Sequence, residues 1–136
     1  MAERIEHGGT LFALILRKEL DPQATTFYTP KDTSLQLGII KHEKGYKEPP
    51  HIHKHSKKLV HDVVESLHIE YGKVEVNFYN EKGKRIDRTI LNEGDVALLI
   101  NGGHAIRALE TFKAIKIKQG PYLSIEEDKQ FLEVKE

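Results

Sequence analysis

Short apolar runs separated by turn residues are the feature that most limits what this chain can fold into. They include TLFALILR at 10–17, VVESLHIEY at 63–71 and GDVALLI at 94–100, and glycine, proline or asparagine interrupts the chain between such runs. Runs of this length, several of which alternate apolar and polar residues, are typical of strands, whose side chains point to opposite faces in turn. Roughly eight to ten strands at spacings of about 8–12 residues predict an all-β, double-sheet barrel.

The segment KVEVNFY at 73–79 shows this alternation clearly. Val74, Val76 and Phe78 are predicted to share one face. Gly83, in the turn sequence NEKGKR, predicts a hairpin that joins this strand to RIDRTIL at 85–91.

The C-terminal part of the chain departs from the β pattern. Ser124 followed by Glu127 fits a capping box in SIEEDKQFLEV, which predicts a short helical or irregular appendage after the barrel. Before it, Ile115 and Ile117 alternate with Lys116 and Lys118, as expected of one more strand.

Composition narrows the class of protein. The 136 residues suit one domain, 1–136, and 21 basic residues balance 21 acidic ones, so the charge gives no reason to expect a nucleic-acid or membrane partner. The N-terminus lacks a signal-peptide pattern, which favours a cytoplasmic location. There is no cysteine, so any metal must be held by imidazole and oxygen ligands.

The segment PPHIHKH at 49–55 is the strongest candidate for such a site. On a strand, His51 and His53 would point to the same face, whereas the sequence KHSKK places His55, like His61, in a solvated loop. Two imidazoles alone bind a metal weakly, so further ligands are needed.

Two residues further along the chain are candidates for those ligands. Glu65 has the parity of Leu67 and Ile69 on an inward-facing stripe, where a carboxylate is costly unless it is paired or metal-bound. An inward lysine or arginine is the alternative partner of this carboxylate. His104 follows two glycines at the end of a buried strand.

These residues resemble the two motifs of the cupin superfamily. Gly45 is followed by five residues and then His51-Ile52-His53, and Glu65 is followed by six residues and then Gly72. Eleven residues, 54–64, separate His53 from Glu65 where cupins have three or four, so Asp62 and His61 are alternatives to Glu65.

The second motif is a looser match. Gly94 opens it, Ile100 stands where the proline is expected, Gly102 matches, and His104 comes one residue early. The resemblance covers about residues 34–120, which would form the core of the domain. It implies a jelly-roll barrel in which His51, His53, Glu65 and His104 bind a divalent metal ion such as zinc, nickel, iron or manganese. It also implies a homodimer.

Function is less constrained than fold, because cupin-like barrels host many activities. The phrases GGH, KQGPY and DKQF resemble small cupins of surface-polysaccharide and nucleotide-sugar pathways. We therefore expect a small-molecule substrate, sugar-like or hydroxy-keto, and metal-assisted isomerisation or epimerisation. The alternatives are an Fe(II) dioxygenase, a non-catalytic ligand-binding module and a metal-free acid–base isomerase. No catalytic residue is assigned; the candidate helpers are Gln36, His42, Tyr71 and Arg107.

Overall fold

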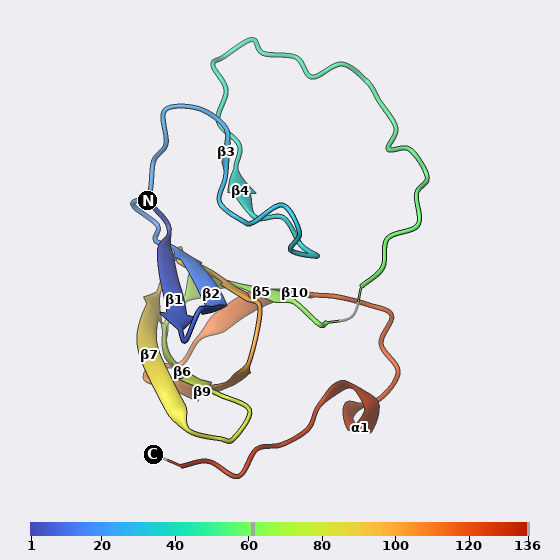
Figure 1. Ribbon diagram of the computed structural model, residues 1–136. Coiled ribbons are helices and arrows are strands. Elements are labelled where there is room, and N and C mark those ends of the chain that lie inside the picture. The colour runs from blue at the N-terminus through green and yellow to red at the C-terminus, as the bar shows by residue number, and fades with distance from the viewer. Residues whose placement is uncertain (61, 136) are drawn as a thin grey trace.

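The computed structural model describes residues 1–60 and 62–135 and is mostly β, with 42% of the chain in strands. One sheet has the order β1-β2-β8-β5-β10, and a second has the order β7-β6-β9 (Figure 1). The strands of the first sheet are β1 (Glu3–His7), β2 (Thr10–Leu16), β8 (Val96–Leu99), β5 (Glu65–Tyr71) and β10 (Lys113–Lys118). Those of the second are β7 (Arg85–Asn92), β6 (Lys73–Tyr79) and β9 (Gly103–Ala108).

Three short elements complete the described part of the chain. The strands β3 (Thr26–Phe27) and β4 (Gly38–Ile39) pair with each other, and α1 (Ile125–Asp128) is a single helical turn. Ser124 caps α1 as its sequence predicts, because its side chain accepts a hydrogen bond from the Glu127 amide. That helix is too short to cross a membrane.

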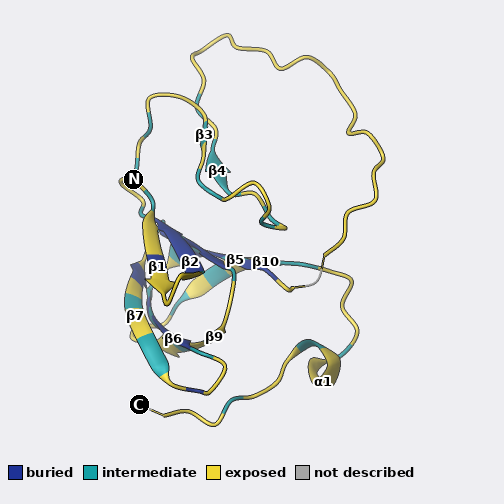
Figure 2. Ribbon diagram, in the orientation of Figure 1, coloured by how far each residue is buried: buried dark blue, intermediate teal, exposed yellow. Residues whose placement is uncertain are grey.

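The hydrophobic core lies between the two sheets. Figure 2 shows buried stretches in strands of both sheets, among them β2 and β6. Val74, Val76 and Phe78 of β6 share the inner face, as predicted, and pack against Leu67 and Ile69 of β5. The predicted hairpin is also confirmed: β6 and β7 are antiparallel neighbours, and Gly83 has a positive φ of 81° in the turn between them.

A smaller apolar layer covers part of the outer face of the first sheet. Leu14, Val64 and Leu98 are buried there beneath Tyr28, Leu35 and Leu37. Within the apolar segment 34–42 only Gly38–Ile39 forms a strand, and Leu35 and Leu37 cover this outer face. The double-sheet antiparallel fold is therefore present, whereas no closed barrel is identified in the described ranges.

The N-terminal strands are part of the hydrophobic core, which therefore extends beyond residues 34–120. Ala13, Leu14 and Ile15 of β2 are fully buried, because β2 lies between β1 and β8 in the five-stranded sheet. β1 forms the edge of that sheet and carries charged residues, a common protection against pairing with other chains.

The segment from Ile40 to Val64 departs most from expectation. None of its described residues lies in a strand, so His51 and His53 do not sit on the strand that their spacing predicted. The segment arches away from both sheets in Figure 1 and is almost wholly exposed in Figure 2. The eleven residues after His53 are longer than a tight turn, and the prolines at 49 and 50 lack the amide hydrogens that a sheet would use.

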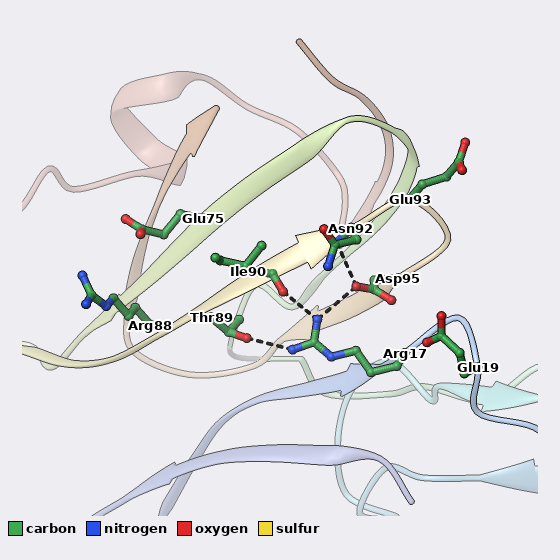
Figure 3. Close-up of a pocket in the computed structure, with 9 residues that line it drawn as sticks. All are labelled: Arg17, Glu19, Glu75, Arg88, Thr89, Ile90, Asn92, Glu93 and Asp95. Atoms are coloured by element: carbon green, nitrogen blue, oxygen red, sulfur yellow. Dashed lines mark hydrogen bonds and ion pairs between the residues drawn. The ribbon is translucent and has the colours of Figure 1, made fainter. Parts of the chain in front are cut away.

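A buried polar network ties the two sheets together at the end of β2. Asp95 accepts hydrogen bonds from the Lys18 amide (2.9 Å), the Asn92 amide (2.8 Å) and the Arg17 guanidinium (3.0 Å). Figure 3 shows Arg17 reaching from the end of β2 to Thr89 and the Ile90 carbonyl on β7. Five residues that line an open hollow at this point, Arg17, Thr89, Ile90, Asn92 and Asp95, are bonded to one another, so the network is structural.

Core packing predicts that alanine substitutions at two isoleucines on neighbouring strands lower the free energy of unfolding by unequal amounts. Ile69→Ala should lower the free energy of unfolding by about 2–4 kcal/mol, because the side chain is fully buried between the sheets. Ile115→Ala should cost less than about 1 kcal/mol, because that side chain is 47% exposed. Urea unfolding of both variants measures the difference, and equal costs would contradict the assigned faces of β5 and β10.

The Asp95 network makes a second stability prediction. Asp95→Ala should lower the free energy of unfolding by about 2–4 kcal/mol, because two backbone amides and a guanidinium lose a buried acceptor. Glu93→Ala in the same turn is the matched control, and it should stay within about 0.5 kcal/mol of the parent chain since Glu93 is exposed. Thermal or urea unfolding that leaves Asp95→Ala as stable as the control would refute this role.

Candidate active site

Two of the four predicted ligand residues meet between the sheets. Glu65 begins β5 in the five-stranded sheet, and His104 lies near the start of β9 in the three-stranded sheet. Their side chains approach to 2.8 Å between His104 Nε2 and Glu65 Oε1. Glu65 is only 7% exposed and lies on the inward stripe of Leu67 and Ile69, as its parity predicted.

A lysine completes the pairing of this carboxylate. Lys116 Nζ of β10 lies 3.7 Å from Glu65 Oε2, so the inward cation considered from sequence is present together with the histidine. The hydrogen bond with His104 is the main reason that the pKa of Glu65 lies below its ordinary range, and the charges of His104, Lys116 and Lys118 add to it against the opposing effect of burial. The geometry therefore keeps Glu65 ionised at neutral pH.

The pair opens into a cavity of about 540 Å³. Its polar wall contains Glu65, His104, Lys116 and Lys118, and its apolar wall includes Leu99 and Ile106. A cavity of this size, mixed in polarity and carrying a few convergent polar groups, is typical of small-molecule sites.

The C-terminal segment covers this cavity. After α1 the chain runs back beneath the sheets toward the β6–β7 turn (Figure 1), and all residues of 128–134 except Glu133 line the cavity. We call residues 128–135 the C-terminal cover. Lys118 Nζ binds Asp128 Oδ2 at 2.9 Å at one end of the cover. At the other end, the Lys135 amide donates to the Gly83 carbonyl at 2.7 Å, and its carbonyl accepts from the Arg85 amide.

Local sequence explains how His104 reaches this position. Gly102 has a positive φ of 74°, and a side chain there would collide with the ring of Phe12. Glycine tolerates both the positive φ and the close approach of the Phe12 ring, so the tight turn from β8 into β9 depends on Gly102. His104 is opposite Phe78 of β6 in the strand register, so its side chain lies on the inner face of the three-stranded sheet.

The other two predicted ligands lie elsewhere. His51 and His53 are exposed in the long loop, and neither lines the cavity. Their rings contact each other edge to face, with the ring centroids 5.4 Å apart. His51 Nδ1 lies 2.9 Å from the Pro49 carbonyl, and its Nε2 lies 3.6 Å from Glu48. Within residues 1–60 and 62–135, no group of three or more His, Asp or Glu side chains is arranged to hold a metal ion. The four residues therefore do not fit a metal in this arrangement.

The remaining sequence candidates do not join the site. Asp62 is exposed, and His61 lies outside the described residues; His55 is exposed, as expected of a loop residue. None of the four candidate helpers lines the cavity: His42 stacks on Tyr46, Arg107 pairs with Glu75, Gln36 binds nearby loop carbonyls and Tyr71 is exposed.

Three charged residues of the site were not identified from sequence: Lys116, Lys118 and Asp128. The alternation of isoleucine and lysine in β10 predicted a strand but did not say which set faces inward. The register with β5 places Lys116 opposite Leu67 and Lys118 opposite Glu65, so both lysines lie on the inner face and line the cavity, although the Lys116 side chain is 43% exposed. The buried Glu65 on the neighbouring strand was the available signal, because it requires an inward cation.

Comparisons with protein-family models, curated proteins and solved structures find no match to this chain. The cupin resemblance therefore depends on the motif residues alone.

The buried pair predicts a pH-dependent contribution to stability. Glu65→Gln should lower the free energy of unfolding at pH 7 by about 1–3 kcal/mol, because the buried charge that binds His104 and forms an ion pair with Lys116 is lost. Since the folded pKa of Glu65 is lowered, this contribution is present above its ordinary value of 4.5 and is lost as pH falls through the folded value.

Unfolding measured from pH 7 to pH 3 should therefore show the gap between parent and variant closing in acid. Glu70→Gln, a change of the same type on the opposite face of β5, is the control and should leave stability within about 0.5 kcal/mol. A gap that stays constant across this pH range would contradict the pairing.

Proposed function

We propose that this chain is a cupin-like β-sandwich enzyme that isomerises or epimerises a small sugar-like hydroxy-keto molecule by proton transfer. The observation that carries the proposal is the 2.8 Å contact between His104 and Glu65 at the wall of a cavity that also contains Lys116. A base, an orienting carboxylate and a cation in one cavity are the groups that proton abstraction beside a carbonyl requires.

His104 is the proposed base. When its ring is neutral, Nε2–H donates to Glu65, so the lone pair for proton abstraction is on Nδ1. Glu65 holds the ring in that tautomer and stabilises the imidazolium that forms once the proton has arrived. Because Glu65 is ionised and almost fully buried, its negative charge acts at short range on the ring.

Lys116 is the proposed electrophile. A substrate carbonyl oxygen placed at its ammonium group would gain negative charge as the neighbouring C–H bond breaks, and the cation would stabilise that charge. The C–H electron pair becomes the C=C bond of an enediolate, while the carbonyl electrons move to oxygen. For isomerisation, His104 returns its proton to the former carbonyl carbon while the hydroxyl proton of the enediolate passes to the former carbonyl oxygen. For epimerisation, a solvent proton reaches the opposite face of the original carbon, and His104 releases its own proton to solvent.

A divalent-metal enzyme is the second candidate, and the unpaired edge of β9 favours it. Among the described residues β9 is hydrogen-bonded to β6 alone, while the exposed segment containing His51 and His53 pairs with no strand. An open edge can accept an extended segment. Docking of that segment would be required to bring the two histidines toward His104, and either isomerase or Fe(II) dioxygenase chemistry would then be open to the site.

Hydrogen–deuterium exchange at carbon separates these two candidates with simple model substrates. Each of a panel of hydroxy-ketones, neutral and phosphorylated, is incubated with the protein in D₂O, and loss of the C–H signal beside the carbonyl is followed by NMR. The proposal expects exchange that is insensitive to chelator. His104→Ala should reduce it by at least about 100-fold, since a positioned base contributes about 10²–10⁴-fold.

His53→Ala is the matched histidine control and should retain exchange within about twofold under the leading proposal, since His53 is outside the cavity. Loss of exchange in His53→Ala together with sensitivity to chelator would support the metal candidate instead. Oxygen uptake by iron-loaded protein would distinguish a dioxygenase. Ligand binding without exchange would indicate a non-catalytic binding module.

A further inference from the structure

We propose that the cavity binds a molecule carrying a carboxylate or phosphate group, and that Asp128 occupies the anion position on Lys118 until such a ligand displaces it. The inference names the substrate class of the proposed function and uses the same cavity. It depends on the contacts of Lys118, Asp128 and the C-terminal cover.

Lys118 presents a cation to the cavity beside the reacting groups. It lies two residues from Lys116 on the same strand, so both side chains emerge on the same face of β10. Lys118 is also directly opposite Glu65 in the register of β10 and β5, so the two side chains emerge side by side on the same face of the sheet. An anionic group bound at Lys118 would therefore be held near the His104–Glu65 pair.

Asp128 is the cover residue that supplies the opposing charge. Its side chain is 14% exposed and 2.9 Å from Lys118 Nζ, whereas its helix neighbours Glu126 and Glu127 are exposed. A carboxylate on a side chain of this chain has the same charge and hydrogen-bonding atoms as the carboxylate of a ligand. In this arrangement Asp128 occupies the position that a ligand anion would take.

The rest of the cover is held loosely, so it can leave. No residue of α1 is buried, and Phe131, the largest side chain beyond it, is 82% exposed. Leu132 packs against Gly103, and backbone bonds at Lys135 hold the far end. Segments with few buried apolar contacts open at low free-energy cost.

Charge determines what can replace Asp128. With the cover in place, Lys116 pairs with Glu65 and Lys118 pairs with Asp128. If the cover lifts, Lys118 loses the carboxylate that pairs with it. An anionic ligand would replace this ion pair, whereas a neutral sugar would leave Lys118 without a carboxylate partner in the cavity.

The test compares three hydroxy-ketones that differ in charge: dihydroxyacetone, dihydroxyacetone phosphate and hydroxypyruvate. Their dissociation constants are measured by NMR titration of the full chain. The phosphate or the carboxylate compound, or both, should bind at least about tenfold more tightly than the neutral one, and the stronger of the two identifies the anion. Equal affinity for all three would overturn the proposal.

Variants then test the role of Asp128. Asp128→Asn should tighten binding of the preferred anion by about three- to tenfold, because the fraction of open sites rises. Glu126→Gln removes the same charge from the same helical turn without touching Lys118, and it should leave binding unchanged within about twofold. Unchanged or weaker binding in Asp128→Asn would refute displacement.

Lys118→Gln should weaken anion binding by at least about tenfold while leaving affinity for dihydroxyacetone the same. If this variant does not fold, inorganic phosphate provides the second measurement: it should compete with the preferred anion, and more strongly in Asp128→Asn than in the parent chain. Failure to compete would also overturn the proposal. Tight anion binding without hydrogen exchange would reject the proposed catalysis but retain this inference, and exchange without anion preference would do the reverse.

Discussion

The buried carboxylate of Glu65 is the constraint on which the site depends. A charge between two packed sheets is destabilising unless cations and donors meet it there. β5 supplies the carboxylate, β10 supplies Lys116 from the neighbouring strand, and β9 supplies His104 from the opposite sheet. The pair with His104 exists only because the two sheets pack face to face, so the same packing that buries the core also assembles the site.

A second buried carboxylate shows why burial alone does not define a functional site. Asp95 is as well buried as Glu65, but its partners are two backbone amides and Arg17, which is itself tied to β7. Glu65 instead pairs with two side chains that face a cavity and keep further hydrogen-bonding capacity. The first arrangement fixes the fold, and the second leaves groups available to a ligand.

The orientation of β10 links the fold to the proposed ligand. Inward lysines on an edge strand protect it from pairing with another chain, and in this sandwich they also form the cationic wall of the cavity. Lys116 then serves the proposed chemistry, while Lys118 is matched by Asp128 of the C-terminal cover. The exposed Ile115 and Ile117 are the consequence of turning those lysines inward.

Local patterns in the sequence determined most strands of the sandwich but not β1, together with the β6–β7 hairpin, the cap of α1 and the inward position of Glu65, because alternation and turn residues act over a few neighbours. Tertiary structure alone decided which face of β10 points inward and which residues meet Glu65, since both depend on the opposite sheet. The spacing of His51 and His53 predicted a shared face only if they lay on a strand. In the structure these histidines lie in an unpaired loop, because pairing depends on a partner strand that local spacing does not specify.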